Sequence, residues 1–203
     1  MLERKFLDLI SKYSQNHRYN SECWVEISNY YSSKNRFYHT LEHLENMLKE
    51  LEKSESLVQD LDSLLFSIFY HDIIYKSTKT DNEHKSALIL ESRLSETSFE
   101  NIEKCKAQIE ATKDHALSAH GDTNILLDLD LSILGKSRKE YDKYSAAIRK
   151  EYKIYPDFMY RKGRKKVLKH MLENSSIYKT DFFKDLYELQ ARENLQFELN
   201  QLS

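Results

Sequence analysis

The chain has 203 residues, of which 40% are hydrophobic and 32% charged, and its net charge is −2; this fits a globular protein with one domain and its own core. So small a net charge excludes an overall field that would draw the protein to nucleic acid or to a membrane. One Pro and three Gly are far fewer than the roughly 5% and 7% of ordinary usage, so turns and hairpins built on these residues are scarce.

Apolar residues recur at helical spacing along the chain, and the alternation typical of strands is absent. In chain order, the pattern predicts helices over residues 2–13, 21–31 (with Ser21 as N-cap), about 39–53, about 59–75, 80–95, 98–109, 125–134 (closed by Gly135), 137–155, 157–174 and 180–201. Thr80 to Glu83 has the S/T-x-x-E form of a capping box. We therefore predict an all-α fold, a single-domain bundle of about nine or ten helices over residues 1–203.

Two further observations bear on location. Cys23 and Cys105 cannot make a disulfide framework, which favours a reducing, cytoplasmic setting. The N-terminal segment is amphipathic and mixed in charge, unlike a signal peptide, and no apolar stretch approaches the roughly 20 residues that span a bilayer.

Histidines cluster around a polar pair in an apolar setting. His39 and His43 are four residues apart, which would place both on one face of the predicted helix. The pair His71-Asp72 follows the apolar run of residues 64–70. A buried carboxylate beside a buried imidazole costs several kcal/mol unless it is compensated, and a divalent cation compensates it. A single histidine of this kind is more often a hydrogen-bonded core residue, but the cluster favours a metal site.

The candidate ligands form a mixed nitrogen and oxygen set. In order they are His39, His43, His71, Asp72, His84, His115, His120, Asp128 and Asp130. Such a set suits a six-coordinate Mn, Fe, Co, Mg or Zn ion with water in open positions. Helix neighbours diverge by about 100°, so His71 and Asp72 share an ion only if it lies astride their helix. Asp128 and Asp130 face about 200° apart, so only one of them should bind.

At this point the sequence resembles a known family. The segments RFYHTLEHL, FYHDIIY, TDNEHKSA, ATKDH, LDLDLSILG, YDKY, IRKEY, GRKKVL and ARENL, between Arg36 and Leu195, are similar to the HD-domain superfamily of metal-dependent phosphohydrolases. The likeness extends to a subgroup of "predicted HD-superfamily phosphohydrolases" of about this length, and the YHTLEH element is similar to one in class I cyclic-nucleotide phosphodiesterases.

The resemblance implies a role for each matched residue. The metal ligands would be His43, His71, Asp72 and Asp130, with His39 as the proton donor to the leaving group. Asp128 is then interpreted as a neighbouring or salt-bridged acid. The substrate class would be a nucleotide or a related small phosphate ester.

Two further assignments each have a structural alternative. His115 would bind a second metal or the phosphate, although a structural role is equally open. Members of the superfamily often place an acid soon after the HD pair to orient water, and here the sequence continues IIYK, so Glu83 would serve from the next helix. The capping box explains Glu83 equally well. His84, His120 and His17 are expected at the surface.

Basic residues supply candidate substrate contacts: Arg36, Lys113, Arg149 and Arg164. The segment RKGRKKVLKH has six Lys and Arg and no acid, which indicates either a solvated helix face or a phosphate clamp with bidentate arginines. The net charge disfavours nucleic acid as a partner, and a homodimer is left open.

Two other classes remain open from sequence. The chain could be a metal-binding or nucleotide-binding module without turnover, or a di-iron oxygenase on the same scaffold with His115 and His120 as extra ligands. Metal stoichiometry separates them, because two tightly bound irons favour the oxygenase and one exchangeable Mn or Mg the hydrolase.

Overall fold

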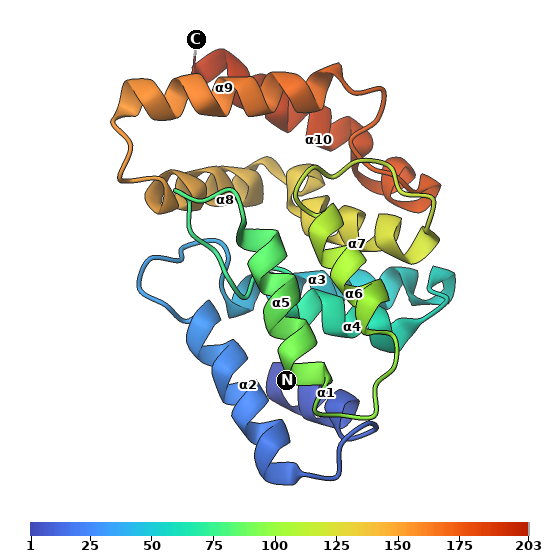
Figure 1. Cartoon of the computed structure of the whole chain (residues 1–203). Helices are drawn as coiled ribbons and strands as arrows, with labels where there is room; N and C mark the ends of the chain where they lie inside the picture. The colour runs from blue at the N-terminus through green and yellow to red at the C-terminus, as the bar shows by residue number, and fades with distance from the viewer. Residues whose placement is uncertain (203) are drawn as a thin grey trace. The chain divides into compact units, whose positions relative to one another are not determined.

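The computed structural model describes residues 1–202. All regular structure in that part of the chain is helical, which confirms the all-α prediction. The α-helices are α1 (Leu2–Ile10), α2 (His17–Tyr31), α3 (Leu41–Ser54), α4 (Leu61–Tyr70), α5 (Asn82–Leu94), α6 (Ile102–Ala111), α7 (Gly121–Leu131), α8 (Arg138–Glu151), α9 (Asp157–Glu173) and α10 (Asp181–Gln201), with 3₁₀ helices η1 (Glu55–Leu57) and η2 (Ser132–Gly135) (Figure 1).

The chain divides into two compact units, Met1–Leu126 and the part from Leu127 onward, with the boundary inside α7. Each unit is described by itself, and the expectation of one domain over residues 1–203 stays a prediction. None of the helices within residues 1–202 is both long and apolar enough to cross a membrane. Cys23 and Cys105 are both free and buried.

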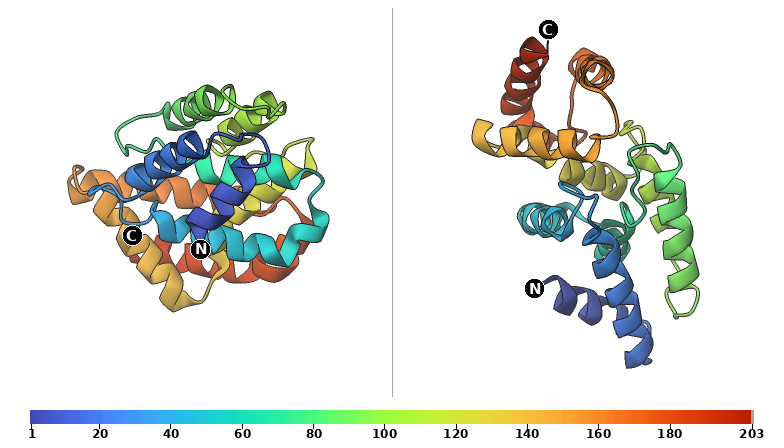
Figure 2. Two further views of the ribbon diagram at one scale, coloured as in Figure 1. Left: turned by 90° about the horizontal axis from the view of Figure 1, so that it is seen from below. Right: turned by 90° about the vertical axis from the view of Figure 1, so that its left-hand side faces the viewer.

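The central helix of the first unit is α4, which packs on α1, α3, α5 and α6. Every residue from Ser63 to Tyr70 is buried, because apolar side chains occupy nearly the whole circumference of this helix. Phe69 packs edge-on against Phe6 of α1 with ring centroids 5.2 Å apart. The helices α5 and α6 form an antiparallel pair joined by residues 95–101 (Figure 2). The other helices of the first unit therefore surround α4, and His71 lies at its C-terminal end.

In the second unit α10 packs on η2 and α9. Gly135, the last residue of η2, does not have a left-handed backbone. A Cβ there would lie 2.4 Å from the Cβ of Tyr187, so this glycine permits the close approach of η2 to α10. The first turn of α8 has a capping box formed by Ser137 and Glu140.

Several predicted helix ends are wrong. The N-cap of α2 is Asn16, which accepts a hydrogen bond from the Tyr19 amide, so Ser21 lies inside the helix. The sixth helix begins at Ile102 rather than Ser98. No capping box forms at Thr80–Glu83, because the residue at the N-cap of α5 is Asp81. Helix ends depend on which backbone groups find partners, and a motif of four residues does not determine that.

Candidate metal centre

The pair His71-Asp72 lies at the end of α4. The sequence pattern predicts that this helix continues to about residue 75, but its last residue is Tyr70, and His71 is the C-cap. Asp72 is in the turn that follows, so the pair are not neighbours within a helix, and the condition that a shared ion lie astride the helix does not apply. The C-terminal end of a helix carries a partial negative charge from its carbonyl groups, which favours a cation at this position.

His43 reaches the same place from the first turn of α3, whose N-cap is Thr40. His39 lies in the turn before the helix, so the expectation that both histidines share a helix face is wrong. The two rings are nonetheless neighbours, with centroids 5.9 Å apart. The turn before α3, and not a shared helix face, brings the two rings together.

Three atoms that can each offer a lone pair converge here. The Nε2 atoms of His43 and His71 are 3.2 Å apart, and the Nε2 of His71 is 3.2 Å from Oδ2 of Asp72. Within residues 1–202 this is the group of His, Cys, Asp and Glu side chains whose ligand atoms all lie within 4.8 Å of one another. His43 and His71 are buried and Asp72 is half-buried. The geometry fits one metal ion held by two imidazoles and a carboxylate.

The tautomer of His71 supports this fit. Its Nδ1 is 2.9 Å from the carbonyl oxygen of Ile68, and a carbonyl oxygen only accepts hydrogen bonds. Nδ1 therefore carries the proton, and in the neutral ring Nε2 presents a lone pair toward His43 and Asp72. Metal-binding histidines ordinarily donate their other ring N–H in this way, which fixes both the tautomer and the ring orientation.

Neighbouring residues hold the turn that carries Asp72. The amide of Asp72 donates to the Tyr31 hydroxyl at 3.1 Å. Asn82 accepts from the amide of Lys76 at 3.1 Å and donates to its carbonyl at 3.0 Å, and Ser86 accepts from the amide of Ile74 at 3.1 Å. Sequence reasoning missed these residues. The signal was the spacing of Asn82 and Ser86, four apart on one face of α5 within TDNEHKSA.

His39 stands beside the ligand group. Its ring is stacked on Tyr75, with centroids 3.9 Å apart and planes inclined by 27°. Its Nε2 is 3.8 Å from Oδ2 of Asp72, and its side chain retains 15% of its exposure. A residue in this place is near the ligand group and still reachable from solvent.

Four other predicted site residues are not members of the ligand group formed by His43, His71 and Asp72. Glu83 is half-buried in the first turn of α5, Lys113 is exposed after α6, and Asp130 is half-buried in the part of α7 that belongs to the second unit. His115 is half-buried and has a positive φ of 47°, an uncommon conformation for a residue with a side chain. The roles of Glu83, Lys113, His115 and Asp130 stay predictions.

The three histidines expected at the surface lie there. Asp128 was interpreted as a neighbouring or salt-bridged acid, and it holds backbone amides instead. His17, His84 and His120 are exposed, and His84 pairs with Glu110 at 2.9 Å. The buried Asp128 accepts from the amides of Lys179 and Thr180 at 2.7 and 2.8 Å. Its carboxylate thus holds the start of α10. The choice of Asp130 over Asp128 as the candidate ligand stays a prediction.

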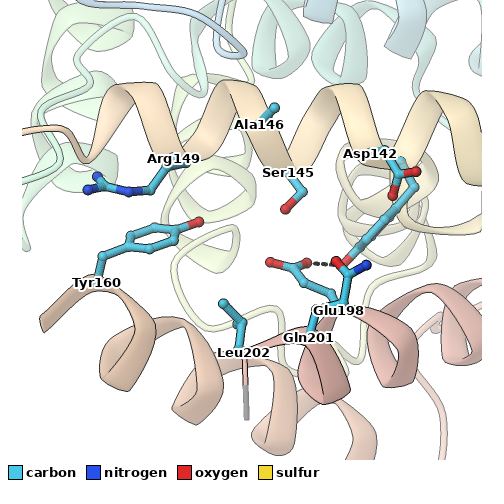
Figure 3. Close-up of a pocket in the computed structure, with 9 residues that line it drawn as sticks. Asp142, Ser145, Ala146, Arg149, Tyr160, Glu198, Gln201 and Leu202 are labelled. Carbon is cyan, nitrogen blue, oxygen red and sulfur yellow. Dashed lines mark hydrogen bonds between the residues drawn. The ribbon is translucent and has the colours of Figure 1, made fainter. Parts of the chain in front are cut away.

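The predicted arginine clamp lies in the second unit. Residues of α8, α9 and α10 line a cavity of about 300 Å³ (Figure 3). Arg164 makes a bidentate pair with the buried Glu198, at 2.8 and 2.9 Å. Arg149 donates to Asp157 at 2.6 Å and to the carbonyls of the turn before α9. Both guanidinium groups therefore have structural partners, and their role in binding substrate stays a prediction.

No protein-family model matches the chain, and the searches of curated proteins and of solved structures find no match either.

Proposed function

We propose that the chain is a metal-dependent phosphohydrolase that acts on a nucleotide or a related small phosphate ester. The observation that carries the proposal is the convergence of His43, His71 and Asp72, with the His71 tautomer set by the Ile68 carbonyl. Asp130 is proposed as a fourth ligand. The motif order from Arg36 to Leu195, which resembles the HD-domain superfamily, supports the reaction class.

The chemistry divides between the ion and the protein. A bound divalent ion lowers the pKa of water and offsets charge on a phosphoryl oxygen. The protein holds two imidazoles and one carboxylate close together. His39, partly exposed beside this group, would donate a proton to the departing oxygen. Stacking on Tyr75 restricts the ring of His39 to one plane.

The two alternatives receive less support. An oxygenase with two irons needs further ligands, and in the described chain the ligand group contains neither His115 nor His120. A binding module without turnover would not need His39 next to the ligands. The proximity of His39 to Asp72 therefore favours the hydrolase.

The test starts from metal-stripped protein. We expect Mn²⁺ to bind with a stoichiometry of about one in titration calorimetry, and a screen of nucleotides and sugar phosphates to show Mn²⁺-dependent phosphate release. His71→Ala should lose both properties, whereas His84→Ala, which removes an exposed histidine, should keep them. Two tightly bound irons with no hydrolysis would favour the oxygenase. Metal binding without turnover on any substrate would favour the binding module.

A further inference from the structure

Arg36 is a buried arginine next to the candidate metal centre. It lies in the segment between α2 and α3 and retains only 7% of its exposure. Its Nη1 donates to the carbonyl oxygens of His39 at 3.1 Å and of Asp72 at 2.7 Å. Its Nη2 donates to the carbonyl of Ile73 at 2.7 Å. One planar group thus contacts both turns that carry functional side chains.

Two tyrosine rings flank the same cation. The guanidinium carbon is 4.8 Å from the ring centroid of Tyr31 and 5.9 Å from that of Tyr75. Tyr31 also accepts the amide of Asp72, and Tyr75 is the ring on which His39 stacks. Each ring near Arg36 therefore also contacts a residue of the candidate centre.

The energetic setting is unusual for an arginine. The three carbonyl partners are neutral oxygens, so these hydrogen bonds satisfy donors without cancelling the charge. Burial of a cation is unfavourable unless hydrogen bonds and aromatic faces compensate it. We therefore expect a buried arginine with carbonyl partners where it fixes the backbone, because an arginine that serves only solubility can stay at the surface.

We infer that Arg36 is a positioning residue that fixes the His39 turn against the His71-Asp72 turn, and so places the metal ligands and the proton donor together. The inference rests on the metal centre of the proposed function, but it does not require hydrolysis. It replaces a contact between Arg36 and substrate with a contact between Arg36 and the backbone of the site.

The planar fork is the decisive feature. Lysine keeps the charge but offers a single ammonium on a flexible stem, which cannot match two nitrogens that together donate to three carbonyls. Loss of groups that support ligands typically weakens metal binding about 10–100-fold. Arg36→Lys should therefore bind Mn²⁺ about 10–100-fold more weakly than the wild type.

The experiment compares Arg36→Lys and Arg36→Ala with Arg18→Lys, a matched control in which the arginine is exposed and pairs with Glu22. Calorimetry would give the Mn²⁺ affinity, and circular dichroism the helix content. We expect both Arg36 variants to keep their helices and lose affinity, and the control to match the wild type. Methylguanidinium added to Arg36→Ala should restore part of the affinity, because it returns the planar donor.

A second readout is independent of metal. Hydrogen exchange in metal-free protein should be faster at residues 38–43 and 71–76 in Arg36→Lys, and unchanged in Arg18→Lys. Wild-type protein that binds Mn²⁺ but hydrolyses nothing would overturn the hydrolase and leave Arg36 assigned. Wild-type affinity and exchange in Arg36→Lys would overturn the assignment. Loss of helix content in both Arg36 variants would also overturn it, because Arg36 would then support the whole fold.

Discussion

Two clusters of polar side chains in this protein are compensated for their burial in different ways. In the second unit, the charge of Arg164 meets the charge of Glu198, and Tyr141 donates to the same carboxylate. In the first unit, two imidazole nitrogens and a carboxylate oxygen, all able to act as acceptors, point toward one another. The comparison teaches that burial of polar groups does not by itself mark a site. The balance of donors and acceptors does.

The two clusters should therefore respond differently to substitution. Removing one partner of a compensated pair leaves an uncompensated charge, so the fold is destabilised. Removing one member of a convergent acceptor group relieves repulsion, so the fold survives while metal binding is lost. The predictions below test this difference.

The largest effect is expected for Asp72→Ala. This change removes the anionic member of the group, so Mn²⁺ binding should fall below detection in calorimetry. Helix content in circular dichroism should match the wild type, because no buried countercharge is abandoned. A largely unfolded Asp72→Ala protein, under conditions where metal-free wild type is folded, would show that the cluster stabilises the fold.

His39→Ala should lower kcat by about 10²–10⁴-fold, because a general acid acts mainly in the transition state. Metal content and substrate affinity should stay near wild type. A nitrophenyl ester should lose much less activity, since its leaving group needs little protonation. Loss of bound metal in this variant would make His39 a ligand, and unchanged turnover of a natural ester would remove it from the mechanism.

In the other cluster, Arg164→Met should lower the free energy of unfolding by about 3–5 kcal/mol, because Glu198 would remain buried without its partner. Mn²⁺ affinity should not change. Arg18→Met, which breaks an exposed pair, is the matched control and should have little effect on urea unfolding. Stability of Arg164→Met equal to the control would mean that the pair is not a compensated charge.

The smallest effect is a pH dependence of the same pair. Burial raises the pKa of the Glu198 carboxyl, but the hydrogen bond and the charge of Arg164, together with hydrogen bonds from Tyr141 and Ser145, outweigh it, so this pKa lies below its ordinary value of 4.5. The stabilisation is then fully present above 4.5 and is lost as pH falls through the folded-state pKa. The stability difference between wild type and Glu198→Gln should shrink as the pH falls below about 4.5. A constant difference would contradict the depressed pKa.

Features of the fold that depend on residues close in the sequence could be predicted, and features that depend on distant residues could not. The apolar run before His71 predicts a buried α4, because burial of a whole helix shows in composition. The predictions for the end of α4 and for the turn at His39 were wrong. Both turns are held by Arg36, whose partner Ile73 is 37 positions away in the chain, and such a contact does not show in a local pattern. The partner of Arg164 lies 34 residues along the chain, so its charge looked available in sequence.

The candidate ligands show the same limit. His43, His71 and Asp72 were predictable because their residue types and apolar surroundings are local. The Ile68 carbonyl that sets the His71 tautomer, and the Asn82 and Ser86 contacts behind the turn, depend on geometry that only packing defines.

The central claim is that one divalent ion binds at this group of side chains. Anomalous diffraction from crystals grown with Mn²⁺ tests it most directly. The account predicts a peak within about 2.0–2.6 Å of the Nε2 atoms of His43 and His71 and an oxygen of Asp72. No peak at this group, or a peak only at the exposed pair of His84 and Glu110, would contradict it.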